Sequence, residues 1–147
     1  MIVKTILMVC QGNICRSPMA EGFFAHQLSA QQSTIVVTSA GLGAVIGYPA
    51  EPHAQTVMLK HGIDISKHRA RQLTENIFRQ TDLIFVMTRS HLHLLTRQFL
   101  AAKGKTFLLG HWQNFEVPDP FKQPYEMFES VYQQMILAWQ DWKIRIL

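Results

Sequence analysis

The apolar run near the start of the chain is the feature that most constrains its fold. Residues 2–9 are mostly apolar, a short polar segment follows at 10–18, and apolar residues then recur with helical spacing. An apolar run of this length is typical of a strand that is buried on both faces, as in a parallel sheet. Ser17 and Pro18 are residue types favoured where helices begin, so we expect a helix there with Ser17 as its N-cap. The opening of the chain therefore predicts a strand, a tight loop and a helix.

The rest of the chain repeats this alternation. Hydrophobic periodicity and turn residues predict strands at 2–9, 34–38, 83–87 and 105–109, and helices at 17–30, 51–61, 74–78, 90–102 and 121–147, with a Gly-rich loop at 39–49. Four strands alternating with helices indicate one α/β domain over residues 1–147, a three-layer sandwich whose parallel sheet has helices on both faces. In such sheets ligands bind beyond the carboxyl ends of the strands, where the loops after the first and fourth strands meet.

Composition narrows the classes of protein that this chain can be. Of 147 residues, 48% are apolar, which is enough for a core. No run approaches the roughly 18 apolar residues of a membrane span. The first residues lack the layout of a signal peptide, so we expect a cytoplasmic protein without membrane insertion. Two cysteines five positions apart do not form a secreted disulfide framework. Scattered basic residues and a net charge of +4 favour an anionic substrate over nucleic acid.

The segment between the first strand and helix can hold a phosphate-sized anion. Its main-chain N–H groups can turn inward as a nest, at the positive end of the following helix dipole. Cys10 stands where the strand ends, and the field that attracts an anion also favours its thiolate. Arg16 adds a planar fork that can grip two phosphoryl oxygens. This combination suggests phosphoryl transfer through a cysteinyl-phosphate, although a C-x5-R pattern is also compatible with a buried thiol beside an ordinary turn.

The segment 10–19, CQGNICRSPM, resembles the phosphate-binding loop of the low-molecular-weight protein-tyrosine phosphatases. That family carries its general-acid Asp in a downstream Asp-Pro pair, which corresponds here to Asp119 and Pro120. Residues 39–44 and 110–114 further resemble the bacterial subgroup that serves capsule and exopolysaccharide systems. The resemblance covers essentially the whole chain. It implies a sheet in the order 2-1-3-4 and a monomer that needs no cofactor or metal. The implied substrate is a phosphotyrosine protein, such as a bacterial tyrosine autokinase.

The resemblance also implies a role for each residue of the two motifs. Cys10 is the nucleophile, Arg16 holds the phosphoryl oxygens, and Asp119 protonates the leaving group, whose phenol has a pKa of roughly 10. Ser17, Ser39 and His68 are expected to tie the loop in place through Asn13. Contacts with the phosphate or the aryl ring are assigned to Gln11, Gly12, Asn13, Ile14, Cys15, Ser17 and Phe121.

Several of these residues have a second interpretation. Asp119 lies in a Val-Pro-Asp-Pro segment that is also typical of a surface turn, and Phe121 could be a core residue. Ser17 could cap the helix, donate to the Cys10 thiolate, or do both. Cys15 could form a protective disulfide with Cys10 under oxidation, as in the family, or remain an inert buried thiol.

Three other functions are compatible with parts of the pattern. An arsenate reductase on this fold would need further cysteines, and none follows Cys15. A phosphoarginine phosphatase would have Thr in place of Ile14, whose branched apolar side chain suits a flat aryl ring. A non-catalytic phosphate-binding module would need neither a nucleophile nor an acid. Eukaryotic family members carry a Trp near residues 44–46, and its absence here predicts a more open cleft.

Overall fold

The sheet of the computed structural model, which describes residues 2–147, has four strands in the order β2-β1-β3-β4. Every neighbouring pair is parallel, and Cys10 lies opposite Gly41 at the carboxyl end of the central strand β1. The predicted strand order is confirmed. The strands are β1 (Thr5–Cys10), β2 (Val36–Gly41), β3 (Leu83–Val86) and β4 (Thr106–Leu108).

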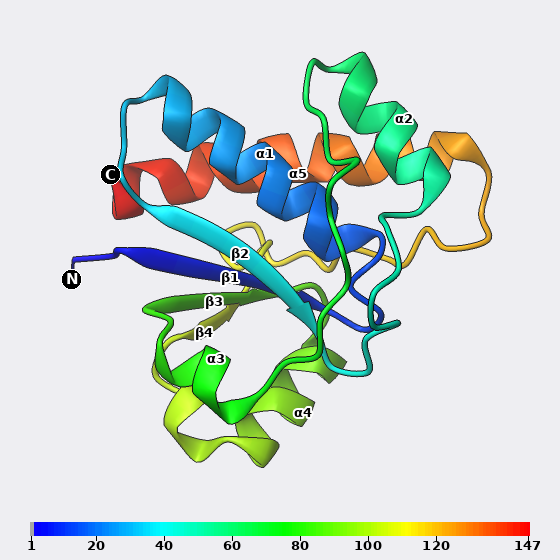
Figure 1. Ribbon diagram of the computed structural model, residues 1–147. Helices are drawn as coiled ribbons and strands as arrows, with labels where there is room; N and C mark the ends of the chain where they lie inside the picture. The colour runs from blue at the N-terminus through cyan, green and yellow to red at the C-terminus, as the bar shows by residue number, and fades with distance from the viewer. Residues whose placement is uncertain (1) are drawn as a thin grey trace.

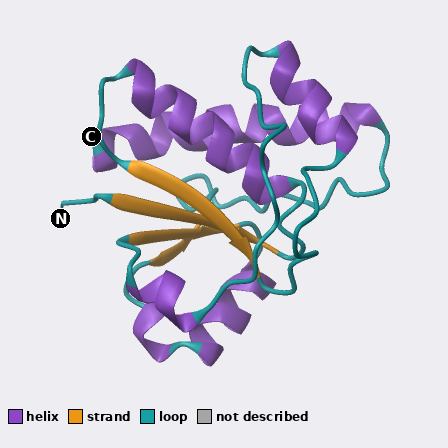
Figure 2. Ribbon diagram, in the orientation of Figure 1, coloured by secondary structure: helices purple, strands orange, loops and turns teal. Residues whose placement is uncertain are grey.

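Helices cover both faces of this sheet, as Figures 1 and 2 show. On one side lie α1 (Arg16–Ala30), α2 (Pro52–Lys60) and α5 (Tyr125–Ile146). On the other side lie α3 (Glu75–Arg79) and α4 (Arg89–Gln98), which is followed by the 3-10 turn Leu100–Ala102. The predicted three-layer α/β sandwich is therefore confirmed. None of the helices in residues 2–147 combines the length and apolar character needed to cross a membrane.

Alternate residues of β1 point into two separate cores. Ile6 and Met8 are fully buried against the α1 and α5 side, whereas Leu7 and Val9 pack on the side of α3 and α4. This alternation follows from the period of two along a strand. Because β1 is buried on both faces, the loop that follows it begins from a fixed position.

Two boundaries that differ from the predictions concern functional residues. The strand β2 extends to Gly41, so Ser39 lies in the sheet and not in the Gly-rich loop. The helix α1 begins at Arg16 with Cys15 at the N-cap position, so the prediction of Ser17 as N-cap is wrong. The physical reason is that the Ser17 hydroxyl is only 2.9 Å from Cys10 Sγ and does not bond to the helix backbone.

Other boundaries moved for backbone reasons. α4 ends at Gln98 because Phe99 is extended, with φ −129° and ψ 95°. α5 begins at Tyr125 and not at residue 121, since Lys122 has a φ of +65° and interrupts the helix pattern. The predicted cap of α3 is confirmed, because the Thr74 side chain accepts a hydrogen bond from the N–H of Ile77.

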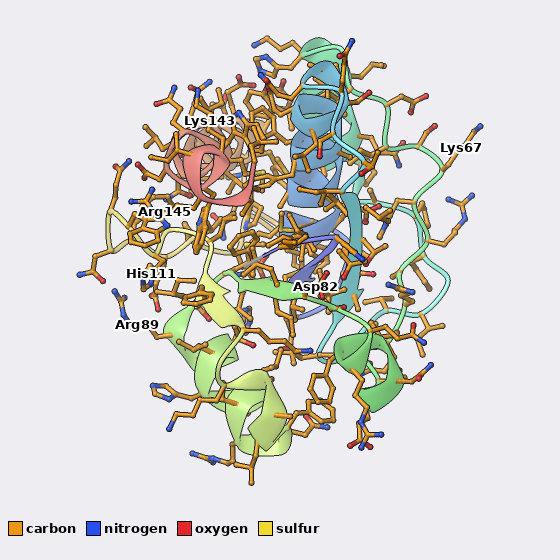
Figure 3. The ribbon with its side chains drawn as sticks, turned by 90° about the vertical axis from the view of Figure 1, so that its left-hand side faces the viewer. Lys67, Asp82, Arg89, His111, Lys143 and Arg145 are labelled. Carbon is orange, nitrogen blue, oxygen red and sulfur yellow. The ribbon has the colours of Figure 1, made fainter. Side chains whose placement is uncertain are left out.

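The long segment after β4 is anchored to the far end of α5. Trp142 donates through Nε1 to the carbonyl of Leu109 at 2.8 Å, and the guanidinium of Arg145 lies 3.6 Å from the ring centroid of Trp112. Figure 3 shows Arg145 and His111 on this side of the molecule. Val117, further along, donates its N–H to the carbonyl of Met87 at 2.9 Å. These contacts bring the chain back to the carboxyl ends of the strands.

Candidate active site

Five consecutive carbonyl groups of the loop after β1 are tied to the surrounding scaffold. They accept hydrogen bonds of 2.7–3.0 Å from four main-chain N–H groups and one imidazole; the pairs are Cys10 with Leu42, Gln11 with Gly43, Gly12 with Val45, Asn13 with His68, and Ile14 with Glu51. The N–H groups of residues 12–15 donate to no other described residue. Asn13 adopts a φ of +60°, a left-handed conformation that Asn tolerates better than most residues. With its carbonyls turned outward, the loop presents free N–H groups beside a helix N-terminus, which is the geometry of an anion site.

Cys10 lies at the end of β1 with 2% of its surface exposed, and it contacts a hydrogen-bond network. Asn13 Nδ2 donates to Ser17 Oγ at 2.7 Å and to Ser39 Oγ at 3.0 Å. His68 Nε2 is 2.7 Å from the carbonyl oxygen of Asn13. The structure thus brings together the four residues that were expected to hold the loop.

Arg16 is the first residue of α1, and its side chain is 5% exposed. Its Nη1 donates to the carbonyl of Val117 at 3.0 Å, and its Nη2 is 3.7 Å from Asp119 Oδ2. Its Nε is buried and has no hydrogen-bond partner in the described part of the chain. Buried N–H groups of a guanidinium are nearly always paired, so this unsatisfied donor is suited to a planar oxyanion.

Asp119 reaches the same site from the segment between β4 and α5. Its side chain is 54% exposed, and its Oδ1 accepts the N–H of Phe121 at 3.1 Å. The carbonyl of Val117, two residues earlier, holds the Arg16 side chain. One short stretch therefore both fixes the guanidinium and carries the carboxylate.

Cys10, Arg16 and Asp119 line one cleft of about 230 Å³. Ile14, Val45 and Phe121 supply its apolar walls. Phe121 is 43% exposed, so the alternative that it packs in the core is wrong. Apolar walls above an anion cradle suit a flat aryl group that carries a phosphoryl ester.

Sequence reasoning missed two residues that line this cleft, Gly43 and Val45. The loop around residues 44–46 was noted only for the Trp that it lacks, and nothing in the local sequence indicates which of its side chains turns inward. The contact that turns it is the hydrogen bond from the N–H of Val45 to the carbonyl of Gly12. This pairing joins segments far apart in the chain, so no local pattern predicts it.

Two buried titratable groups lie close to the charged residues of the cleft. Burial, with a smaller effect of the Asp119 charge, raises the pKa of the Cys15 thiol far above its ordinary value. Cys15 therefore stays protonated at neutral pH and is a weak nucleophile. Burial, with the Arg16 charge as the second cause, lowers the pKa of His91 to about 4. The His91 imidazole is thus neutral, and its buried Nδ1 has no hydrogen-bond partner among residues 2–147.

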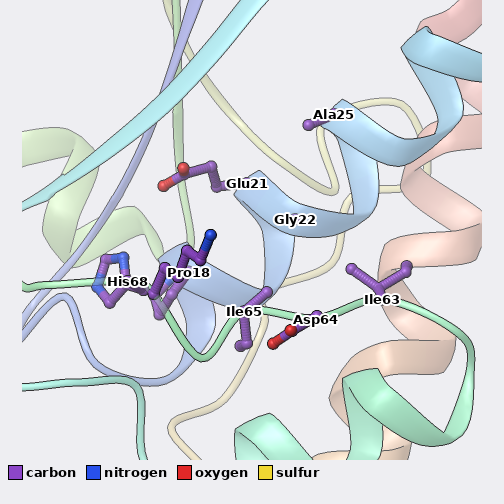
Figure 4. Close-up of a pocket in the computed structure, with 9 residues that line it drawn as sticks. Pro18, Glu21, Gly22, Ala25, Ile63, Asp64, Ile65 and His68 are labelled. Carbon is purple, nitrogen blue, oxygen red and sulfur yellow. The ribbon is translucent and has the colours of Figure 1, made fainter.

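A larger cleft of about 520 Å³ lies between α1 and the segment 63–68. Figure 4 shows that Glu21 and His68 line it, together with Pro18 and Ile65. It contains no cysteine, serine or threonine nucleophile. Within residues 2–147 no group of three or more His, Cys, Asp or Glu side chains is arranged to hold a metal ion. Because the smaller cleft combines a thiol, a guanidinium and a carboxylate, it is the candidate active site.

This fold and this site define a family. The family model described as low molecular weight phosphotyrosine protein phosphatase matches residues 5–145. The chain belongs to this family, and it is accordingly a protein-tyrosine phosphatase. The family predicted from the two motifs is confirmed.

Several similar proteins come from bacteria. The chain is 41% identical over 145 residues to the probable low molecular weight protein-tyrosine-phosphatase EpsP of Ralstonia nicotianae, covering 99% of this chain and 97% of the relative. The crystal structure of the Erwinia amylovora tyrosine phosphatase AmsI has a TM-score of 0.92 at 40% identity, covering 99% of this chain and 94% of that one. Vibrio vulnificus Wzb in complex with benzylphosphonate has a TM-score of 0.91 at 37% identity, covering 98% and 99%. These names confirm the predicted capsule and exopolysaccharide subgroup.

Proposed function

We propose that this chain hydrolyses protein phosphotyrosine through a cysteinyl-phosphate intermediate, with Cys10 as nucleophile, Arg16 as the phosphoryl clamp and Asp119 as general acid. The observation that carries the proposal is the convergence of these three side chains in one cleft beneath free loop N–H groups. A module that only binds phosphate needs neither the thiol nor the carboxylate. The proposal takes residues 1–147 as one catalytic domain that acts as a monomer without a metal.

The first chemical step forms the bond between Cys10 Sγ and phosphorus and breaks the bond from phosphorus to the phenolic oxygen. The loop N–H groups and Arg16 hold the three equatorial oxygens as negative charge develops on them. Asp119, in its protonated form, gives its proton to the leaving oxygen, because a phenolate is a poor leaving group at neutral pH. The exposed position of its carboxyl leaves it accessible to the substrate.

The second step releases phosphate and restores the thiolate. A water molecule attacks phosphorus, the sulfur–phosphorus bond breaks, and the Asp119 carboxylate takes the proton from that water. The hydroxyl of Ser17, 2.9 Å from Cys10 Sγ, can donate to the departing sulfur. Because the sulfur leaves as an anion, this hydrogen bond strengthens as the bond breaks.

Hydrolysis of p-nitrophenyl phosphate by wild type, Cys10→Ser and Cys15→Ser tests the mechanism. We expect turnover to persist in EDTA and in Cys15→Ser, and to be lost in Cys10→Ser. Undiminished turnover in Cys10→Ser would remove the proposed nucleophile. Asp119→Asn should slow esters of poorly acidic phenols by about 10²–10⁴-fold and esters of acidic phenols far less. Equal slowing of both groups of esters would remove the acid role.

The proposed physiological substrate is a phosphorylated bacterial tyrosine autokinase of a polysaccharide export system, met in the cytoplasm. Its support is the naming of the relatives as EpsP, AmsI and Wzb and the apolar walls of the cleft. Incubation of a Cys10→Ser trap with lysate of the source bacterium, followed by identification of the retained phosphoprotein, tests this assignment. Retention of a phosphoarginine protein would contradict it. Competition between phosphotyrosine and phosphoarginine peptides, measured on wild type and Ile14→Thr, would then show whether residue 14 determines the choice of substrate.

A further inference from the structure

The hydrogen-bond network around the loop does not end at Ser39. Ser39 Oγ donates to Glu21 Oε1 at 2.5 Å, so the network continues from β2 to a carboxylate on α1. Glu21 is only partly buried and lines the larger cleft beside His68, as Figure 4 shows. The Glu21 carboxylate of α1 is thus connected through three side chains to the sulfur of Cys10.

The direction of each hydrogen bond in this network follows from its two ends. Asn13 Oδ1 accepts the main-chain N–H of Arg71 at 2.9 Å, which fixes which end of the amide is the oxygen. The Nδ2 group must then donate to both Ser17 and Ser39. Each serine hydroxyl has one hydrogen, and each must point it away from Asn13. An ionised carboxylate only accepts, so the Ser39 hydrogen goes to Glu21.

The same reasoning determines the contact with the nucleophile. Ser17 Oγ already accepts from Asn13, and its remaining hydrogen faces the sulfur 2.9 Å away. We infer that Glu21 is a positioning residue: its carboxylate takes the Ser39 hydrogen and so holds the Ser39 oxygen as an acceptor for Asn13, which helps to keep Asn13 in the position from which it directs the Ser17 hydrogen to the Cys10 thiolate. The inference rests on the proposed function, in which Cys10 reacts as a thiolate.

The inference can be tested by the direction in which removal of the Glu21 carboxylate shifts the pH at which Cys10 becomes reactive. The clefts that it lines also contain Lys67, His68, Arg69, Arg71 and Asp64. Among the described residues none of the basic groups lies within 4.0 Å of the Glu21 carboxylate, and the Ser39 hydroxyl is the only hydrogen-bond donor to it. Acting through space alone, a negative charge disfavours a thiolate, and its removal would lower the pH at which Cys10 becomes reactive. Acting through the network, its removal raises that pH.

The experiment measures the rate of Cys10 alkylation by iodoacetate against pH in wild type, Glu21→Ala and Glu21→Gln, each in a Cys15→Ser background. We expect the midpoint to rise by about 0.5–1 pH unit in Glu21→Ala, and by less in Glu21→Gln, because the amide oxygen still accepts from Ser39. We expect kcat for p-nitrophenyl phosphate to fall about 3–10-fold in Glu21→Ala, with KM within about twofold. Glu126→Ala, an exposed carboxylate of α5 without a hydrogen bond in the described structure, is the matched control and should match wild type.

A midpoint that is unchanged or lower in Glu21→Ala would overturn the inference. A double-mutant cycle adds a second criterion: in a Ser39→Ala background, Glu21→Ala should shift the midpoint no further, and an additive shift would also overturn it. Alkylation needs no substrate, so these outcomes are separate from the failure of the proposed function, which would appear as retained phosphatase activity in Cys10→Ser.

Discussion

The two halves of the active site are built in opposite ways. In the loop of residues 10–16 the side chains of Cys10, Asn13, Cys15 and Arg16 are buried, and every carbonyl from Cys10 to Ile14 is hydrogen-bonded to the scaffold. The segment that carries Asp119 and Phe121 is exposed, and the Asp119 carboxylate is held by one hydrogen bond and a 3.7 Å contact to Arg16. The fixed half faces the phosphoryl group, which is the same in every substrate. The open half faces the leaving group and the protein that carries it.

This difference indicates where binding energy and specificity reside. Electrostatic stabilisation of a developing charge requires donors that are already in place and need no reorganisation. A general acid has to reach leaving groups in different orientations, and an exposed carboxyl allows this. Changes in the fixed half should therefore alter turnover with all substrates, and changes in the open half should alter the choice among them.

The largest effect should come from the guanidinium. Arg16→Lys keeps the charge but loses the planar fork and the buried Nε donor, so kcat/KM for p-nitrophenyl phosphate should fall about 10²–10³-fold. The exposed Arg69→Lys is the matched control and should retain wild-type kinetics. A loss below about tenfold in Arg16→Lys would mean that the loop N–H groups hold the phosphoryl oxygens without the fork.

The free energy of unfolding should depend on pH through the buried His91. The pKa of His91 is lowered to about 4 in the fold, against about 6.5 when unfolded, so the unfolded chain binds the proton first as pH falls. Stability is therefore complete above about pH 6.5 and decreases through the window down to pH 4, by up to about 3 kcal/mol. Urea unfolding at pH 7.5 and 4.5 should show a smaller loss in His91→Leu than in wild type. Exposed His93, on the same helix, gives the control His93→Leu, whose loss should equal that of wild type; equal losses in all three proteins would contradict the assignment.

The loop itself can be weakened without changing its backbone. Asn13→Gly permits the φ of +60° but removes the three hydrogen bonds of the side-chain amide. We expect the free energy of unfolding to fall by about 1–3 kcal/mol and kcat to fall about tenfold. Asn114→Gly, at another left-handed Asn that does not line the cleft, is the matched control for the glycine itself. Similar kinetics in the two variants would show that the backbone alone fixes the cradle.

The smallest effect should come from the open rim. Phe121→Ala removes an aromatic wall but keeps the N–H that binds Asp119, so KM for an aryl phosphate should rise about 3–10-fold with kcat within about twofold. Trp112→Ala is the control, because Trp112 is as exposed, at 44%, but does not line the cleft. A fall in kcat with unchanged KM would show instead that Phe121 positions the acid.

Much of this arrangement follows from local sequence. The apolar run into Cys10, the alternation of strands and helices, and the Thr cap of α3 each depend on neighbouring residues, and the structure has all three. The two motifs also identified the family, and with it the strand order. The N-cap prediction for Ser17 was wrong, because Ser is a residue type favoured at helix starts but its hydroxyl can equally contact a buried side chain. Only the fold shows that it lies against Cys10 Sγ.

What local sequence could not supply is the set of contacts between distant segments. Ser39 was expected in a loop, since glycines follow it, yet pairing with β1 draws it into the sheet. Glu21 reads as an ordinary polar residue of an amphipathic helix, and only its 2.5 Å contact with Ser39 distinguishes it. Val45 enters the cleft through its bond to Gly12. Each of these depends on which surfaces meet after folding.

A crystal structure of the protein soaked with orthovanadate examines the principal assignment most directly. We predict vanadium bonded to the thiol sulfur of residue 10, its equatorial oxygens within hydrogen-bonding distance of the N–H groups of residues 12–16, and one oxygen paired with Arg16 Nε. An oxyanion bound in the larger cleft, with that sulfur unmodified and Arg16 Nε still unpaired, would contradict it.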